Sequence, residues 1–243
     1  MGMDGGERRG LDLSGVGRAS IFTMRGEALL ATLRNEARSG HPVAAVLRHA
    51  AREEIVDPTR PELPLLTAEG HAAAEAFGAS LGDFARVRLF FSPVQRCQQT
   101  AEGIARGVRR LGATAEIHGA HEALGIGYTR DRDEFGRLFE LHGPHFVRLW
   151  CGGELPANVI DPADRCASEI LAHIRERLAE VASTPRALDL HVSHDINIMA
   201  VREQFVGLRH EDVGWLNFLD GVAFGWRESG LRAIYRERHR ELA

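Results

Sequence analysis

Apolar residues recur along the chain with two different periods, which predicts alternating strands and helices. Continuous apolar runs end at Arg48 and Phe91, and an alternating run leads to His194. Short runs of this kind are typical of strands in a parallel sheet. Apolar positions three and four residues apart predict helices over about 25–38 and 163–182. The alternation predicts an α/β fold, a three-layer α/β/α sandwich with a mostly parallel central sheet.

Polar residues mark where two further helices begin. Thr67 precedes a segment with helical apolar spacing, and we expect it to be the N-cap of that helix. Ser92 and Pro93 follow a strand-like run, with Gln95 at the capping-box position. We therefore expect Ser92 to cap a second helix, whose first turn contains Arg96.

The organisation of the chain follows from its length and from the spacing of these elements. With 243 residues, of which 44% are apolar, and no Ser/Pro-rich linker, it is long enough for one substantial domain. We divide it into an N-terminal extension, 1–40, with its helix, and a single domain, 41–243. The pattern loosens over 120–165, which suggests a cap segment whose aromatic residues either select a leaving group or pack a core. Residues 222–226 and 231–235 predict a closing pair of strands at the sheet edge.

Residues suited to phosphate chemistry stand at the predicted strand ends. Arg48 and His49 follow the first strand, and Arg52 comes three residues later. Arg96 lies where the backbone donors of a helix start favour an anion, and His194 ends another strand. Ligand sites in α/β folds gather at the carboxyl ends of strands. Guanidinium groups can hold phosphoryl oxygens while an imidazole attacks phosphorus. A single Arg-His pair, taken alone, is more often an ordinary surface pair.

Four segments in this order resemble the histidine phosphatase superfamily, which is phosphoglycerate mutase-like or acid phosphatase-like. The resemblance covers roughly residues 43 to 200, and its motifs are short but specific in combination. They are Arg48-His49, Leu66–Gly70, Ser92–Glu102 and His194. The family begins with Arg-His-Gly, whereas this chain has Ala50. Because alanine resists the positive φ that glycine adopts, this departure puts activity in question.

The resemblance implies phosphoryl transfer without a metal ion or other cofactor. His49 would be the nucleophile that forms a phosphohistidine, which water then hydrolyses. Arg48, Arg52, Arg96 and His194 would hold the phosphoryl oxygens. The implied activity is hydrolysis of a small-molecule phosphate ester, such as a sugar phosphate or a nucleotide. A phosphomutase and a non-catalytic binding or regulatory module are the alternatives, and the oligomeric state is not predicted.

Two carboxylates are candidates for the general acid that protonates the leaving group. Asp195 directly follows His194 and looks like the acid of the acid-phosphatase branch. Glu122 stands where the mutase-like branch places its acidic residue. We favour Asp195 from the sequence. The structural alternatives are a helix N-cap for Asp195 and a solvated loop carboxylate for Glu122.

Composition excludes several other classes of protein. All 30 basic residues are arginine, so the chain lacks the lysine of a P-loop, of a kinase strand and of a Schiff base. A formal net charge of -4 with dispersed arginines offers no continuous basic patch for nucleic acid. No apolar stretch has the length of a membrane span and no signal peptide is recognisable, so we expect a cytoplasmic protein.

The cysteines and histidines do not form a recognisable metal-binding pattern. Three cysteines stand far from metal-ligand spacing, and an odd number argues against a disulfide scaffold. Neither His142/His145 nor His191/His194 has a carboxylate partner at helical spacing. On a strand, His191 and His194 point to opposite faces. We therefore interpret His191 as a packed strand residue and expect no metal.

Overall fold

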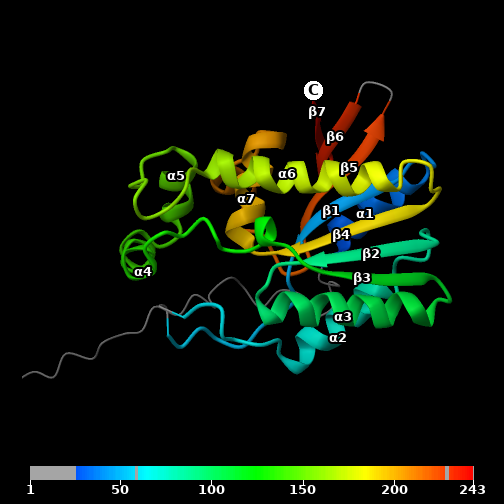
Figure 1. The fold of residues 1–243 in the computed structure, drawn as a ribbon, viewed down its shortest axis with the longest axis horizontal. Coiled ribbons are helices and arrows are strands. Elements are labelled where there is room, and N and C mark those ends of the chain that lie inside the picture. The colour runs from blue at the N-terminus through cyan, green and yellow to red at the C-terminus, as the bar shows by residue number, and fades with distance from the viewer. Residues whose placement is uncertain (1–25, 58–59, 228–229, 243) are drawn as a thin grey trace, which may run out of the picture.

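The computed structural model describes residues 26–57, 60–227 and 230–242, which contain a seven-stranded sheet (Figure 1). Its strands are β1 (Val43–Arg48), β2 (Arg86–Phe91), β3 (Thr114–Ala120), β4 (Ala187–Ser193), β5 (Gly221–Arg227), β6 (Gly230–Tyr235) and β7 (Arg238–Leu242). Their spatial order is β3-β2-β4-β1-β5-β6-β7. β1, β2, β3 and β4 are parallel, while β5, β6 and β7 each run antiparallel to the preceding neighbour. The sheet is therefore mixed and partly parallel.

The C-terminal strands differ from the prediction at the sheet edge. β5 and β6 pair as expected, although their connection at residues 228–229 lies outside the described residues. Beyond them, β7 pairs with β6 and forms the edge instead. Four of its five residues are exposed, so its sequence lacks the apolar run by which a strand is recognised.

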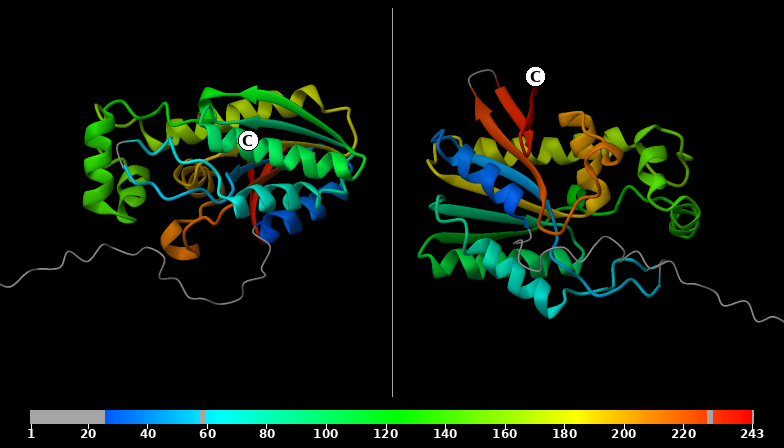
Figure 2. Two further views of the ribbon diagram at one scale, coloured as in Figure 1. Left: turned by 90° about the horizontal axis from the view of Figure 1, so that it is seen from below. Right: turned by 180° about the vertical axis from the view of Figure 1, so that it is seen from behind.

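Helices cover both faces of the sheet (Figure 2), which confirms the three-layer α/β/α architecture. α6 (Ala163–Glu180) and α7 (Asp195–Val206) pack on one face. α1 (Glu27–Ala37), α2 (Ala68–Gly78) and α3 (Gln95–Arg110) contribute to the buried cluster on the other. The observed α1 and α6 agree with the predicted helices, although residue 25 lies outside the described part. No helix in that part is long and apolar enough to span a membrane.

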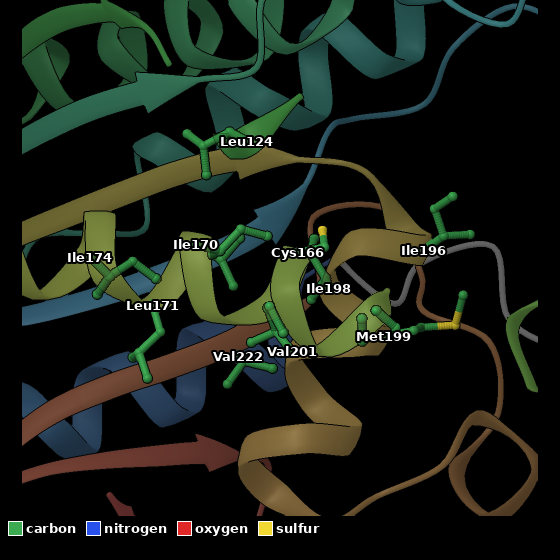
Figure 3. Packing of buried hydrophobic residues seen from close by; sticks show 14 of the residues in the cluster. Leu124, Cys166, Ile170, Leu171, Ile174, Ile196, Ile198, Met199, Val201 and Val222 are labelled. Atoms are coloured by element: carbon green, nitrogen blue, oxygen red, sulfur yellow. The ribbon is translucent and has the colours of Figure 1, made fainter. Parts of the chain in front are cut away.

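Interdigitating aliphatic side chains hold α6 and α7 onto the sheet (Figure 3). Ile170 and Ile174 of α6 and Val201 of α7 are fully buried with Val222 of β5. Burial of side chains of this size contributes about 1.5–3 kcal/mol each to the hydrophobic driving force for folding. This packing fixes the start of α7, and with it His194 and Asp195, relative to the strands.

The predicted cap segment, 120–165, forms short helices beyond one end of the sheet. These are η1 (Glu122–Leu124), α4 (Arg132–His142) and α5 (His145–Cys151); a further short helix, α8 (His210–Val213), precedes β5. The aromatic residues of the segment stack on one another, as Tyr128 does on Trp150 with ring centroids 5.0 Å apart. Phe146 packs against both Phe135 and Phe139. These contacts form a local apolar core, and Tyr128 also lines a cavity of about 300 Å³.

Candidate active site

The strand register brings the two candidate histidines together. β1 and β4 are parallel neighbours in which Arg48 lies opposite Ser193. The next residue of each chain segment, His49 and His194, therefore leaves the sheet at the same edge. The backbone N–H of His49 donates to the Ser193 carbonyl at 3.0 Å. The two imidazoles meet edge to face, with ring centroids 5.6 Å apart.

Ser92 joins the site from the neighbouring strand β2, a role that its sequence position did not predict. Its Oγ lies 2.9 Å from Nε2 of His194 and also accepts the N–H of Val94 at 3.3 Å. The predicted capping of α3 by Ser92 is wrong, because the helix begins at Gln95 and its N-cap is Val94. The serine oxygen is directed toward His194 instead. The available signal was the end of an apolar strand run, which Ser92 shares with Arg48 and Ser193.

The ring of His49 is held in one orientation. Its Nδ1 lies 2.8 Å from the Ala50 carbonyl, which can only accept, so the proton resides on Nδ1. Its Nε2 accepts a hydrogen bond from Nε of Arg96 at 3.0 Å. Burial, reinforced by the charges of His194, Arg96 and Arg48, holds the pKa of His49 well below its ordinary value. The imidazole is therefore neutral at neutral pH, with its lone pair on Nε2.

Arg96 contacts both histidines and the preceding loop. Its Nη2 lies 3.3 Å from Nδ1 of His194, and its Nη1 donates to the Pro61 carbonyl at 2.7 Å. Burial lowers the pKa of His194 to about 3, with Arg96 acting in the same direction. Because Arg96 can only donate, Nδ1 of His194 accepts and Nε2 carries the proton shared with Ser92. The buried, neutral histidines leave the guanidinium as the positive charge between them.

Arg48, the residue before His49, is held by three contacts. Its Nη2 forms an ion pair with Oδ2 of Asp195 at 2.8 Å, and its Nη1 donates to the Leu216 carbonyl at 2.6 Å. The guanidinium carbon lies 4.1 Å from the ring centroid of Phe218. This geometry favours a cation over the aromatic face. Segment 215–218, which the sequence did not indicate, thus fixes a predicted phosphate ligand.

Asp195 is engaged through both carboxylate oxygens. Oδ2 accepts the indole N–H of Trp215 at 2.9 Å in addition to the Arg48 contact, and Oδ1 accepts the N–H of Ile196 at 3.0 Å. Burial alone would raise the pKa of Asp195, but Arg48 and Trp215 outweigh it and the pKa lies below its ordinary value. The carboxylate is ionised at neutral pH.

Arg52 lies at the margin of this group. It is partly exposed, and its Nη1 donates to the Glu53 carbonyl at 2.7 Å. Burial, followed by the charges of Arg96 and Arg48, lowers the pKa of Arg52 to about 10. The contributions of Arg96 and Arg48 show that three guanidiniums lie near one another, an arrangement suited to a multiply charged anion.

Ala50 occupies the position of the family glycine without backbone strain. It is absent from the described non-glycine residues with positive φ, which are Arg186, Leu219 and Arg236. Its N–H donates to Oγ1 of Thr100 at 3.0 Å, and this hydroxyl donates to the Arg96 carbonyl at 2.8 Å. The substitution is therefore compatible with the backbone around His49, and Thr100 links that backbone to the helix bearing Arg96.

The start of α2, at Thr67, packs against the backbone that follows His49. Thr67 Oγ1 accepts the Gly70 N–H at 3.0 Å, which confirms the predicted N-cap. A Cβ at Gly70 would lie 2.0 Å from the Ala51 carbonyl oxygen. The glycine of this motif is thus required for the close approach of α2 to the turn that follows His49.

Glu122 lines a groove, together with residues that follow β2. It begins η1 and is exposed, and its carboxylate forms no hydrogen bond or ion pair within the described residues. The groove has a volume of about 400 Å³ and is also lined by Pro93 and Gly125. A Cβ at Gly125 would lie 3.8 Å from Oγ of Ser92. The groove therefore begins beside the residue that contacts His194.

The other histidines lie outside this group. His191 is fully buried on β4 with its ring stacked on Phe90, 4.9 Å between centroids, which confirms its interpretation as a packed strand residue. His142 ends α4 and His145 begins α5. Within the described ranges, no group of three or more His, Cys, Asp or Glu residues is arranged to hold a metal ion.

The structure thus places a buried, neutral histidine beside Arg48 and Arg96 at the carboxyl ends of parallel strands, where ligand sites gather in α/β folds. The sequence profile of the histidine phosphatase superfamily (branch 1) matches residues 44–220. The chain belongs to this superfamily, and its fold is phosphoglycerate mutase-like. No curated protein matches it by sequence.

Solved structures with the same fold include both phosphatases and a mutase. Mycobacterial glucosyl-3-phosphoglycerate phosphatase Rv2419c has a TM-score of 0.57 at 15% identity, over 80% of this chain and 98% of that chain. Phosphoglycerate mutase from Bacillus anthracis has a TM-score of 0.52 at 14% identity, over 85% and 94%. A phosphoserine phosphatase mutant from Entamoeba histolytica, in complex with phosphoserine, has a TM-score of 0.53 at 18% identity, over 81% and 97%. At these identities the likeness establishes the fold alone.

Proposed function

We propose that this protein hydrolyses phosphate monoesters through a phosphohistidine on His49, without a metal ion. The observation that carries the proposal is the state of the His49 ring. Its Nδ1 proton is bonded to the Ala50 carbonyl, its pKa is low, and the lone pair of Nε2 faces Arg96. A neutral imidazole with an oriented lone pair is a nucleophile for phosphorus.

In the first step, Nε2 of His49 forms a bond to phosphorus as the bond to the ester oxygen breaks. Arg48, Arg52, Arg96 and His194 are the proposed ligands of the remaining phosphoryl oxygens. Arg96 donates to the same Nε2 atom, so its N–H must turn from His49 to a phosphoryl oxygen before attack. Most of the catalysis then comes from positioning and from charge stabilisation.

The leaving oxygen takes a proton, for which we propose Glu122. Asp195, which the sequence favours, has a lowered pKa and both oxygens engaged by Arg48, Trp215 and its neighbouring backbone. Those contacts suit a residue that orients Arg48. Glu122 has no such partner in the described part and faces the groove that begins beside Ser92. Asp195 stays the second candidate for the acid.

In the second step, water attacks phosphorus, the bond to Nε2 breaks, and the water proton passes to the carboxylate that served as the acid. Inorganic phosphate leaves and His49 is regenerated. The proposed substrate is a small phosphate ester, such as a sugar phosphate or a nucleotide, because the groove of about 400 Å³ is of small-ligand size.

The test is release of inorganic phosphate from a panel of phosphate esters, with chelator present, by the wild type and by His49→Ala. We expect wild-type turnover and its near-complete loss in the variant. Undiminished turnover by His49→Ala would refute the role of His49. Formation of an isomeric ester without free phosphate would identify the mutase alternative, and binding with neither product would identify a non-catalytic module.

A further inference from the structure

The groove beside the phosphate site is lined by a carboxylate that accepts no hydrogen bond within the described residues. Glu62 lines the groove, and its side chain is 24% exposed. Its Oε1 lies 3.8 Å from Nε of Arg60 and 3.7 Å from Nη1 of Arg132. Its Oε2 is buried and has no hydrogen-bond partner within the described residues. A buried acceptor of this kind costs stability unless a donor satisfies it.

Glu62 is close to the phosphate ligands. The carbonyl of the preceding residue, Pro61, accepts the hydrogen bond from Arg96 at 2.7 Å. The Glu62 carboxylate also contributes to the electrostatic environment of Arg96. A phosphate ester bound at Arg96 and His49 would therefore have its leaving group next to Glu62 and the groove.

The charges around the leaving group are predominantly negative. A second cavity of about 300 Å³ shares Glu122 and Gly125 with the groove. Together the two cavities are lined by four carboxylates and two guanidiniums, namely Glu62, Glu122, Asp161 and Glu169 with Arg132 and Arg165.

Both guanidiniums already face carboxylates. Arg132 lies 3.7 Å from Glu62, and Arg165 lies 2.8 Å from Glu169 and 3.6 Å from Asp161. A second anion on the substrate would have to compete with these pairs. A donor would meet acceptors that have capacity to spare, since a carboxylate oxygen has more than one lone pair.

We propose that the groove selects leaving groups that donate hydrogen bonds, hydroxyl or ammonium groups, through the carboxylate of Glu62, and disfavours leaving groups that carry a second anion. This inference rests on the proposed phosphomonoesterase function and defines its substrate class. Phosphorylated alcohols with further hydroxyl or amino groups fit it, and bisphosphates and phosphorylated acids do not. Glu62 acts in specificity and takes no part in the transfer of the phosphoryl group.

The test uses four esters, each with three carbon atoms, that differ in their terminal group: propyl, hydroxypropyl, aminopropyl and carboxyethyl phosphate. We compare kcat/KM for the wild type, Glu62→Gln and Glu140→Gln, the last being an exposed glutamate of α4 that lines neither cavity. Relative to propyl phosphate, we expect the wild type to favour a donor ester about tenfold and to disfavour the carboxyethyl ester about tenfold. In Glu62→Gln both ratios should shrink toward one, while Glu140→Gln should resemble the wild type.

The two donor esters separate the sources of selectivity. A preference for aminopropyl phosphate alone would show that the selectivity comes from charge. An equal preference for hydroxypropyl phosphate would show that it comes from hydrogen bonding, and either result supports the proposal. Wild-type preference for the carboxyethyl ester, or unchanged ratios in Glu62→Gln, would overturn it.

A binding measurement separates this inference from the proposed function. His49→Ala, with and without Glu62→Gln, is titrated calorimetrically with the same four esters. If the wild type releases no phosphate from these four esters or from the wider panel, the hydrolase proposal fails. The ratios of dissociation constants still decide whether the groove prefers donors.

Discussion

Arg48 and Asp195 form an ion pair of 2.8 Å between the end of β1 and the first residue of α7. Trp215 donates to the same Oδ2 atom at 2.9 Å, so three segments distant in sequence converge on one oxygen. The pair is largely removed from solvent, with the side chains 12% and 22% exposed. Because the pKa of Asp195 is lowered, its carboxylate is ionised and carries no proton that it could give to a leaving group. It is suited instead to holding the Arg48 guanidinium in place.

The roles of the two candidate acids are separable by the leaving group. We expect Glu122→Gln to lower kcat for an alkyl phosphate about 100-fold and to have little effect on an aryl phosphate with a good leaving group, because only the alkoxide needs a proton. Asp195→Asn should lower kcat/KM for both esters similarly, by about tenfold, through loosening of Arg48. The measurement is steady-state kinetics with the two esters.

The result that contradicts this assignment is equally specific. If Asp195→Asn, and not Glu122→Gln, is selectively impaired with the alkyl ester, Asp195 is the acid that the sequence favours. If neither variant depends on the leaving group, the proton comes from another residue.

Trp215 should act on phosphate binding through Asp195. In Trp215→Phe the indole N–H is lost, and we expect the pKa of Asp195 to rise because burial is then less opposed. As pH falls, Asp195 would be protonated earlier, Arg48 would lose its partner, and inhibition by inorganic phosphate should weaken about three- to tenfold. The measurement is the inhibition constant for phosphate as a function of pH.

Trp226→Phe is the matched control for that substitution. The indole Nε1 of Trp226 is buried without a hydrogen-bond partner in the described part, so its removal breaks no bond there. An equal change of phosphate inhibition in both variants would show that Trp215 acts through packing and not through Asp195.

Much of this site follows from the sequence because its central residues terminate apolar runs. His49 and His194 directly follow β1 and β4, and parallel strands that are neighbours end at one edge. The sequence does not show which strands are neighbours. That His49 and His194 lie together was therefore expected only from the resemblance to the family. Arg96 was also predicted from its position, because it is the second residue of α3 and lies near the backbone donors of the helix start.

The segment around Trp215 could not be found in the same way. It lies between α8 and β5, where the residues follow neither a helical nor a strand period. The contact of Arg48 with the Leu216 carbonyl spans 168 residues and uses a backbone atom, which carries no residue-type signal. The strand β7 was not predicted either. It is a regular strand, but its exposed polar sequence resembles a loop.

Gly70 should be essential for the backbone beneath His49. In Gly70→Ala the new Cβ would lie 2.0 Å from the Ala51 carbonyl oxygen, so α2 and the turn after His49 have to separate. We expect a loss of about 3 kcal/mol in the free energy of unfolding, as for overpacked buried positions, together with reduced turnover. Gly82→Ala is the control, since its Cβ would make only an ordinary contact of 3.9 Å. Urea unfolding measures both, and equal stability of the two variants would contradict the argument.

A group of buried histidines should make the fold sensitive to acid. His191 and His173 meet edge to face with ring centroids 5.0 Å apart, and neither ring has a hydrogen-bond partner within the described residues. Burial, followed by His121 and Arg177, lowers the pKa of His173 to about 3. Burial, followed by His173 and Arg88, lowers the pKa of His191 well below its ordinary value.

Because these pKa values are lowered in the folded state, the unfolded chain binds the additional protons. Stability should therefore fall as pH drops below about 6.5, by up to about 1.4 kcal/mol per pH unit for each such histidine. The decline should continue toward the folded pKa, about 3 for His173. His191→Phe removes one titrating ring, so its urea midpoint should fall less between pH 7 and pH 5 than that of the wild type. His41→Gln, at an exposed position, is the control, and equal pH dependence of His191→Phe and the wild type would exclude His191 as a source of the acid sensitivity.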